Sequence, residues 1–285
     1  MNIAAVVVLY KCRPDQSPAI ASLVRSWGHR ADGELKLKLI IYDNSPEPQK
    51  ISVSLPFDHQ YFHDAANGGL AAAYNFALQT DPEDNYQWLL LLDQDSELPV
   101  NFAALTAQAL SEAGRMGEVA AIIPQAVHGD RPLSPALLQW WGGVRPVSKP
   151  VPGICPGPVT AINSGTLLRR SFLSEIGGFN LSFKLDYLDH WMFAEMNRRG
   201  KKTYLSQAVI SHDLSTWHGS GSVSPERYRS ILEAETLFYR ITRSRTTYLF
   251  HLLNLALRAG RQYLKGDKQL YPLTLRHLGH AVTNR

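Results

Sequence analysis

The chain has 285 residues, of which 45% are hydrophobic and 19% are charged. This composition is sufficient for a large core and excludes a disordered chain or a coiled coil. The two cysteines, Cys12 and Cys155, are too few for a disulfide framework and lack the spacing of a zinc site, which fits a reducing cytoplasm. No apolar run reaches the ~18 residues that a bilayer-spanning helix needs.

The net charge of +4 is distributed unevenly along the chain. Positions 225–285 contain 11 Lys and Arg and 4 Asp and Glu, a net charge of +7, which leaves −3 for the first 224 residues. A basic tail on a slightly acidic body predicts an anionic partner for the tail, either membrane lipid or nucleic acid.

The first half of the chain alternates apolar runs with helical patterns. The opening run has no basic segment before it, so we expect a buried first strand rather than a signal peptide. Strand–helix alternation predicts a mostly parallel, doubly wound α/β sheet. The expected strands are 4–10, 35–41, a short one near 61, 88–92 and 119–123, and the expected helices are 18–27, 70–79 and 101–113.

The run LLLLDQDSELP, positions 89–99, joins a buried strand to two carboxylates, Asp93 and Asp95. Ligands of open α/β folds lie beyond the carboxyl ends of such strands. Paired carboxylates are costly there unless they bind a cation, and oxygen ligands suit Mg²⁺ or Mn²⁺. The alternative interpretation is a plain turn, with Asp93 as a helix cap or turn former.

The second half begins with a stretch rich in Gly and Pro, positions 129–160, which contains Trp140 and Trp141. It predicts long loops with short strands, where an α/β enzyme builds its substrate pocket. Further strands and helices follow as far as His212, including a helix that ends at Gly200.

The tail, 225–285, has helical spacing with few breakers, and its stretch 246–257 is apolar and carries no formal charge. Two interpretations remain open. The tail packs on the catalytic domain or on a second copy of the chain, or it lies in a membrane interface with its arginines at headgroup level.

The order of the motifs resembles the family 2 glycosyltransferases. VVVLY, YDNS, NGGLAAAYN, LLDQDS, NSG, GGF, LDYLDHW, RRG and SH follow one another between Ile3 and about Trp217, and LDQDS is similar to the rhamnosyltransferase-like branch. The resemblance implies the GT-A fold of nucleotide-diphospho-sugar transferases over 1–224, with a nucleotide-sugar half to about 100 and an acceptor half over 101–224. The tail, 225–285, would be a C-terminal helical extension.

The resemblance also implies a set of donor contacts. Asp43 would accept a hydrogen bond from the imide N–H of uracil or thymine, unless it is a turn residue. A helix N-terminus favours phosphate oxygens, so Asn67 and Gly68 would lie along the nucleotide, whereas Asn75 is either a contact or structural. The implied substrate contacts are Tyr10, Asp43, Asn67, Gly68, Asn75, Asp93, Trp140, Trp141 and Trp217.

A divalent cation, Mg²⁺ or Mn²⁺, is implied as the cofactor. By resemblance Asp95 coordinates it directly, and Asp93 contacts the nucleotide sugar or a metal-bound water. A His near the position of His212 is often a further ligand in the family; the alternatives are a structural role for His212 and a ligand role for His218.

The catalytic base is implied to be a carboxylate near the start of a helix, about a dozen residues before a glycine. Asp189 has this distance to Gly200, and Asp186, one turn away, is the second candidate. Leu188 occupies the place of an acid that the family usually has. The alternative for both carboxylates is stabilisation by the helix dipole.

Together these features predict a metal-dependent, inverting transferase that moves one sugar, rhamnose by preference, from a dTDP- or UDP-sugar to a glycan or lipid-linked oligosaccharide. Because the Gln-Arg-Trp signature of polysaccharide synthases is absent after His212, we expect single addition, as in bacterial O-antigen or lipopolysaccharide assembly. We expect a cytoplasmic protein, peripheral on the inner face of the cell membrane, with a homodimer as an alternative and no nucleic-acid partner.

Two rival functions stay open. A nucleotidyltransferase would carry a Gly-rich basic loop after its first strand, where this chain has YKCRPDQSP. A non-catalytic, membrane-associated glycan-binding scaffold would keep the fold without turnover, and Leu188 gives it some support.

Overall fold

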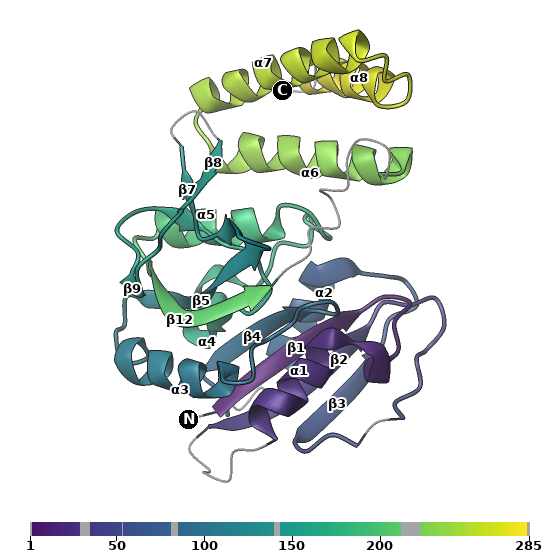
Figure 1. Cartoon of the computed structure of the whole chain (residues 1–285). Coiled ribbons are helices and arrows are strands. Elements are labelled where there is room, and N and C mark those ends of the chain that lie inside the picture. Colours follow the sequence, from purple (N-terminus) through teal and green to yellow (C-terminus); the bar gives the residue numbers. More distant parts are fainter. Residues whose placement is uncertain are drawn as a thin grey trace. The chain divides into compact units, whose positions relative to one another are not determined.

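The computed structural model describes residues 2–28, 35–52, 54–80, 85–139, 143–211 and 223–283 (Figure 1). The chain forms two compact units. Unit 1 comprises residues 1–137 and 146–213, and unit 2 comprises residues 138–145 and 214–285.

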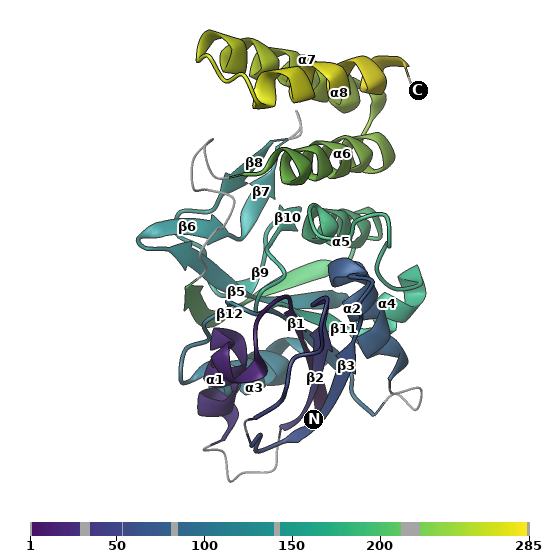
Figure 2. The ribbon, with the colours of Figure 1, turned by 90° about the vertical axis from the view of Figure 1, so that its right-hand side faces the viewer.

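Unit 1 is built on a mixed, mostly parallel sheet (Figures 1 and 2). The strand order is β3-β2-β1-β4-β11-β5-β12-β9, with β6 paired to β5. Strands β3, β2, β1 and β4 are parallel, β12 is parallel to β5, and the short β11 is antiparallel to both of its neighbours. The strands of this sheet are β1 (Asn2–Leu9), β2 (Lys36–Asp43), β3 (Asp58–His63), β4 (Trp88–Asp93), β5 (Val119–His128), β6 (Arg131–Ser134), β9 (Gly153–Ile154), β11 (Leu167–Arg169) and β12 (Lys202–Ser211).

Helices cover both faces of this sheet, which explains why its central strands are continuously apolar. Alternate residues of β1, from Ile3 to Leu9, pack in one cluster with α1 and α3. The residues between them are buried as well, and α2 contacts β1 without belonging to that cluster. The helices of unit 1 are α1 (Pro18–Trp27), α2 (Gly69–Gln79), α3 (Phe102–Ala113), α4 (Arg170–Ile176) and α5 (Leu188–Arg198), with a 3-10 turn at Pro14–Gln16.

The predicted α/β class and the predicted order of strands and helices are confirmed. Between 129 and 160 the chain forms short strands, as expected: besides β6 and β9 these are β7 (Ala136–Leu138), β8 (Val144–Pro146) and β10 (Val159–Thr160). Strand β10 pairs antiparallel with β7.

The strand order reverses at β1. From β1 the chain moves outward to β2 and β3, and it then returns to place β4 on the other side of β1. The loops after β1 and β4 therefore leave the sheet in opposite directions, and the crevice between them is where doubly wound folds bind ligands. Asp93 ends β4 at this place.

The start of α2 is held against the chain before α5. Leu70 N donates to Lys184 O at 2.6 Å. Gly69 has a φ of +82°, and a Cβ at this position would lie 2.3 Å from the same carbonyl oxygen. Only a glycine allows this approach, so the packing of the fold explains why the second glycine of the NGG motif is needed.

Gly69→Ala is expected to lower the free energy of unfolding more than Gly177→Ala does. Gly177 has a φ of +78° with no atom within 4 Å of a Cβ, so alanine there costs only the left-handed backbone penalty, about 1–2 kcal/mol. At Gly69 a clash with backbone adds about 1–3 kcal/mol. Urea denaturation of both variants measures the difference, and equal losses would contradict this packing.

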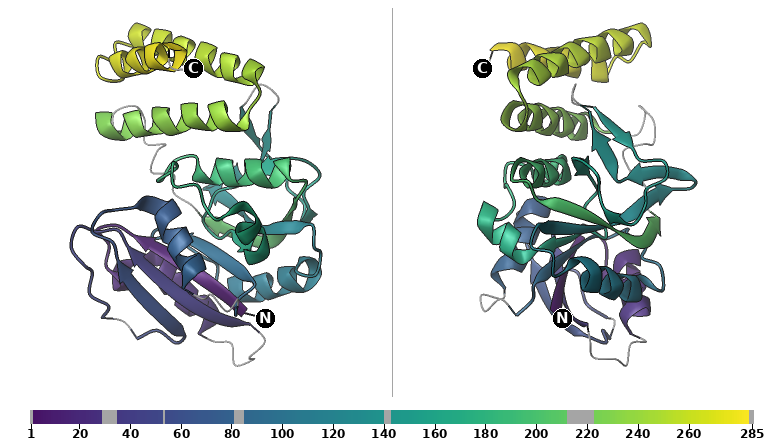
Figure 3. Two further views of the ribbon diagram at one scale, coloured as in Figure 1. Left: turned by 180° about the vertical axis from the view of Figure 1, so that it is seen from behind. Right: turned by 90° about the vertical axis from the view of Figure 1, so that its left-hand side faces the viewer.

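The described residues of unit 2 form the helices α6 (Pro225–Thr242), α7 (Arg245–Leu264) and α8 (Leu270–Thr283) (Figure 3). The hydroxyls of Ser224 and Ser244 cap α6 and α7 by accepting from Arg227 N and Thr247 N. A buried hydrophobic cluster between the helices consists of Tyr228, Leu232, Leu255 and Leu270. None of the described helices combines the length and hydropathy that crossing a bilayer requires.

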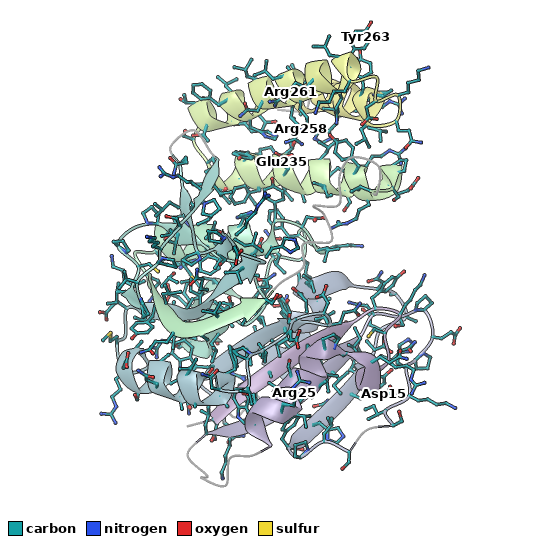
Figure 4. All side chains as sticks on the ribbon, in the orientation of Figure 1. Asp15, Arg25, Glu235, Arg258, Arg261 and Tyr263 are labelled. Atoms are coloured by element: carbon teal, nitrogen blue, oxygen red, sulfur yellow. The ribbon has the colours of Figure 1, made fainter. Side chains whose placement is uncertain are left out.

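The centre of unit 2 is polar. Arg258 on α7 forms two hydrogen bonds of 2.8 Å with the buried carboxylate of Glu235 on α6, and the two side chains point toward one another (Figure 4). Burial lowers the pKa of Arg258, but hydrogen bonding and charge from Glu235 outweigh it and raise the pKa above its usual value. Thr236 Oγ1 joins the ring nitrogens of His251 and His277 at 2.9 and 2.8 Å.

His251 makes the stability of unit 2 depend on pH. It is buried and stacked on Tyr239, and burial, with the positive charge of Arg258 and His277, lowers its pKa from 6.5 to about 4 against the opposing charge of Glu235. Because the folded pKa is the lower one, the unfolded chain binds more protons between these values. The stabilisation is complete above about pH 6.5 and is lost as the pH falls toward 4.

We expect the free energy of unfolding to fall by on the order of 2 kcal/mol more in the wild type than in His251→Gln between about pH 7 and about pH 4.5. His59→Gln, at an exposed position of β3, is the control and should keep the wild-type pH dependence. Urea denaturation at both pH values measures it. An equal loss of free energy of unfolding in the wild type and in His251→Gln would show that His251 is not a buried, neutral imidazole.

Candidate functional site

The acidic turn after β4 is braced by the loop after β1. Gln94 Oε1 accepts from Tyr10 N at 2.7 Å, and Gln94 O accepts from Ser17 Oγ at 2.8 Å. Asp93 is half-buried, whereas Asp95 is exposed. The two carboxylates of the predicted cation site therefore lie on a fixed turn at the reversal point of the sheet.

Ser164, from the NSG motif, anchors Asp93. Its hydroxyl donates to Asp93 Oδ2, although 71 residues separate the two. Gly165 places the serine: it has a φ of +76°, its N–H bonds to Leu91 O at 2.8 Å, and a Cβ would meet Pro124 at 2.9 Å. NSG contributed to the family resemblance, but the sequence assigned no role to Ser164.

The end of β12 lies beside the same turn. Ser211, its last residue, forms an isolated β-bridge with Glu97, two residues beyond Asp95. The predicted metal ligand His212 and its alternative His218 lie outside the described residues, as does Trp217. The predicted stacking residues Trp140 and Trp141 lie outside them as well.

Asp43 ends β2 and is fully buried. Its Oδ1 accepts from Ser45 N at 2.9 Å, and its Oδ2 accepts from Gln49 N at 2.8 Å and from Tyr61 Oη at 2.6 Å. Burial raises the pKa of Asp43, but these hydrogen bonds outweigh it and leave the pKa below its usual value. Burial and the Asp43 carboxylate together raise the pKa of Tyr61 to about 12. In this arrangement Asp43 orders the turn at 44–49.

The N-terminus of α2 was predicted to bind phosphate, but an acidic side chain of the protein, Asp64, already accepts a hydrogen bond there. Asp64 Oδ2 accepts from Gly68 N and from Tyr42 Oη, both at 2.8 Å, and Asp64 Oδ1 accepts from Ala66 N at 3.0 Å. Asn67 adopts a positive φ of 51° in this turn. The amide of Gly68 is thus satisfied by Asp64, a residue that the sequence analysis did not select.

Asn75 links α2 to the segment before α5. Its Nδ2 donates to Phe179 O at 2.8 Å, and its Oδ1 accepts from Phe179 N at 2.7 Å. Gly178 has a φ of +88°, and a Cβ there would lie 2.5 Å from Asn75 Oδ1. These contacts give Asn75 a structural role, and its predicted substrate contact stays a prediction.

The two candidate bases lie at the start of α5 and are both half-buried. Asp189 Oδ1 accepts from His190 N at 2.7 Å, and His190 Nδ1 lies 2.9 Å from Thr160 Oγ1. Between Asp186 and Asp189 the chain turns through Tyr187, whose φ of 62° is uncommon for a residue with a side chain. Leu188, at the place of the usual family acid, is fully buried and belongs to the core.

Tyr74 is a buried side chain whose pKa responds to a carboxylate from each half of the predicted site. It is fully buried on α2, and its hydroxyl has no hydrogen-bond partner among the described residues. Burial is the main reason that its pKa lies well above the usual value, and the charges of Asp93 and Asp189 add to the shift. Both carboxylates therefore act on one hydroxyl. The sequence predicted a helix over 70–79 here and assigned no role to Tyr74.

The pKa of Cys12, in the loop after β1, likewise responds to carboxylates of the predicted site. Burial raises its pKa, and the charges of Asp15, Asp95 and Asp43 raise it further. Asp43, which ends β2, and Asp95, two residues beyond the end of β4, therefore act on the same short loop after β1. Tyr10, a predicted substrate contact, lies in this loop and is 44% exposed.

The side chains at the acidic turn supply part of the ligand set that a divalent cation needs. In the described part of the chain no three His, Cys, Asp or Glu side chains are grouped closely enough to hold a metal ion. Asp93 and Asp95 supply two carboxylates, and Mg²⁺ is typically bound by one or two carboxylates together with substrate phosphates. The residues present suit an ion that a diphosphate helps to hold.

Comparison with known proteins identifies the fold. No family model matches the sequence, and no curated protein matches it. Residues 1–349 of S. aureus TarS, in complex with UDP-GlcNAc, are similar with a TM-score of 0.58 and 13% identity, over 99% of this chain and 81% of that chain. The mannosyltransferase PcManGT from Pyrobaculum calidifontis, in complex with GDP-Man and Mn²⁺, has a TM-score of 0.51 and 12% identity, over 99% of this chain and 86% of that chain.

A longer TarS chain is similar over 92% of this chain, with a TM-score of 0.50 and 12% identity, and this chain spans 44% of its length. Such identities show the fold alone. The chain has the GT-A fold, as predicted, with a mostly parallel central sheet. The rhamnosyltransferase-like branch rests on LDQDS and stays a prediction.

Tyr74→Phe is expected to raise the free energy of unfolding by about 1 kcal/mol, because the lost hydroxyl is buried without a protein partner. Tyr86→Phe is the matched control: that hydroxyl donates to Ala77 O at 2.5 Å, so its removal should cost about 1 kcal/mol. Thermal and urea denaturation measure both. A loss of stability in Tyr74→Phe would contradict an unpartnered hydroxyl.

Proposed function

We propose that the chain is a metal-dependent, inverting glycosyltransferase. It moves one sugar, rhamnose by preference, from a dTDP- or UDP-sugar to a hydroxyl of a glycan or lipid-linked oligosaccharide in bacterial surface polysaccharide assembly, on the cytoplasmic side of the membrane. The observation that carries the proposal is the braced acidic turn at the reversal point of a GT-A sheet. That two proteins of this fold were solved with UDP-GlcNAc and GDP-Man supports a nucleotide-sugar donor.

Asp95 and Asp93 are the residues that would hold the cation, with His212 as a further candidate. A bound Mg²⁺ or Mn²⁺ supplies positive charge to the diphosphate that leaves. Asp95 is exposed and has no hydrogen bond or ion pair with another described residue, so it is available to coordinate, whereas Asp93 is fixed by the Ser164 hydroxyl and suits the sugar or a bound water. Ser211 pairs with Glu97 and precedes His212 in the chain, which supports a third ligand from that side.

Asp189 is the proposed catalytic base. Its Oδ1 accepts from His190 N, so Oδ2 is the atom that would take the proton of the acceptor hydroxyl. The acceptor oxygen then bonds to the anomeric carbon, the bond from that carbon to the diphosphate breaks, and the configuration inverts. Asp93 and Asp189 both act on the Tyr74 hydroxyl, which supports a donor end and an acceptor end within one site. Asp186 is the second candidate.

The remaining contacts concern the nucleotide and the acceptor. Because Asp43 is buried and holds the turn at 44–49, we propose that it shapes the base pocket through this turn. Tyr10 and the Asn67–Gly68 turn would border the nucleotide, and Trp140, Trp141 and Trp217 would provide stacking surfaces for sugar rings.

The test is a screen of nucleotide sugars for binding and hydrolysis with Mn²⁺ or Mg²⁺. We expect one donor to bind to the wild type, at least tenfold more weakly to Asp95→Asn because a metal ligand is lost, and unchanged to Glu97→Gln. Glu97 is a suitable control because it is an exposed carboxylate two residues away, 3.5 Å from Arg25.

Two outcomes would contradict the proposal. Failure of the folded wild type to bind any donor in the presence of metal would favour the glycan-binding scaffold. Equal donor binding by the wild type and Asp95→Asn would show that the cation binds elsewhere or that donor binding needs no cation.

A further inference from the structure

One face of α7 is apolar and yet exposed to solvent. Leu253 and Leu257 keep 54% of their surface exposed, and Leu264 keeps 84%. Leu249 and Phe250 are exposed as well, and this spacing of three or four residues puts them on one side of the helix. The opposite side, which includes His251 and Leu255, is buried. The helix therefore has a second apolar face that the core of unit 2 does not use.

Helix α8 extends this surface. It runs beside α7 (Figures 3 and 4), where Tyr248 Oη donates to Ala281 O at 3.1 Å and the rings of Tyr263 and Tyr271 lie 5.2 Å apart. Like α7, it exposes apolar side chains. The apolar face of α7 and α8 consists of Leu249, Phe250, Leu253, Leu257, Leu264, Leu275 and Val282. Exposed apolar side chains on two adjacent helices are typical of an interaction surface.

The charge around this face is almost entirely positive. Residues 245–283 contain six Lys and Arg and a single acid, Asp267. Arg258 is engaged by Glu235 of α6, so it belongs to the core of unit 2. The other five are exposed: Arg245, Arg261, Lys265, Lys268 and Arg276. A partner for this surface must therefore be apolar and anionic at once.

We propose that the apolar face of α7 and α8 binds the surface of a bilayer that contains anionic lipids. The leucines and Phe250 enter the boundary of headgroups and acyl chains, and the exposed arginines and lysines contact headgroup phosphates. Helix α7 has 20 residues, so it lies along the surface over about 30 Å. A second copy of the chain fits less well, because a two-fold contact would oppose two cationic faces that have one acid each. This inference does not depend on the proposed transferase activity.

The test is flotation of the full chain with vesicles of phosphatidylcholine containing about 30% phosphatidylglycerol, compared with phosphatidylcholine alone. The wild type should float with the anionic vesicles, and binding should weaken several-fold at high salt because the lysine and arginine contacts are screened. The double variant Leu253→Gln, Leu257→Gln should bind at least tenfold more weakly. Glutamine preserves helix propensity, and both positions are exposed, so the variant should fold.

Val151→Gln is the matched control, since Val151 is 81% exposed and belongs to unit 1, and it should bind as the wild type does. Circular dichroism and thermal unfolding check that every variant is folded. Failure of the folded wild type to bind anionic vesicles would overturn the proposal. Unchanged vesicle binding in the double variant would also overturn it, as would a wild-type dimer in light scattering that the double variant converts to a monomer.

Discussion

Two carboxylates lie one residue apart at the end of a strand that is buried on both faces. Their negative charge must be offset by hydrogen-bond donors or by a cation. The two carboxylates repel one another, and partial burial adds a desolvation cost at Asp93. Ser164 donates to Asp93, and Gln94 between the two is fixed by the loop after β1. The order of the strands brings these loops to one crevice. Within the described part of the chain no hydrogen bond or ion pair offsets the exposed Asp95, the group that a cation would neutralise.

Much of the fold followed from local pattern. Apolar runs and helical spacing predicted β1, β2, β4, α1, α2 and α3, and a run that stops at Asp93 predicted an acidic strand end. The short β11, Leu167–Arg169, had no periodicity to reveal that it would be inserted antiparallel between β4 and β5. The tail was predicted as helical, but its division into three helices depends on the Ser244 cap and the turn at Gly266, two weak signals.

The site was predictable only where a motif carried it. LDQDS predicted Asp93 and Asp95, and the Asp189–Gly200 spacing predicted Asp189. Contacts between residues that lie far apart in the sequence could not be predicted. The bond from Ser164 to Asp93 spans 71 residues, and Asn75 pairs with Phe179 across 104. Asp64, which accepts from the Gly68 amide at the start of α2, belongs to none of the quoted motifs. Tyr74, whose pKa is raised by burial and further by the charges of Asp93 and Asp189, lies within NGGLAAAYN, but the motif assigned it no role. The positions of these side chains depend on tertiary contacts, which residue type alone does not predict.

The central claim is that the carboxylate pair and a nucleoside diphosphate complete one cation site together. Ultrafiltration with Mn²⁺, followed by measurement of the metal retained with the protein, tests it most directly. The account predicts that one Mn²⁺ per chain is retained when dTDP or UDP is present, that retention is much weaker without nucleotide, and that Asp93→Asn, Asp95→Asn abolishes it. Equal retention with and without nucleotide, or retention that survives in the double variant, would contradict the account.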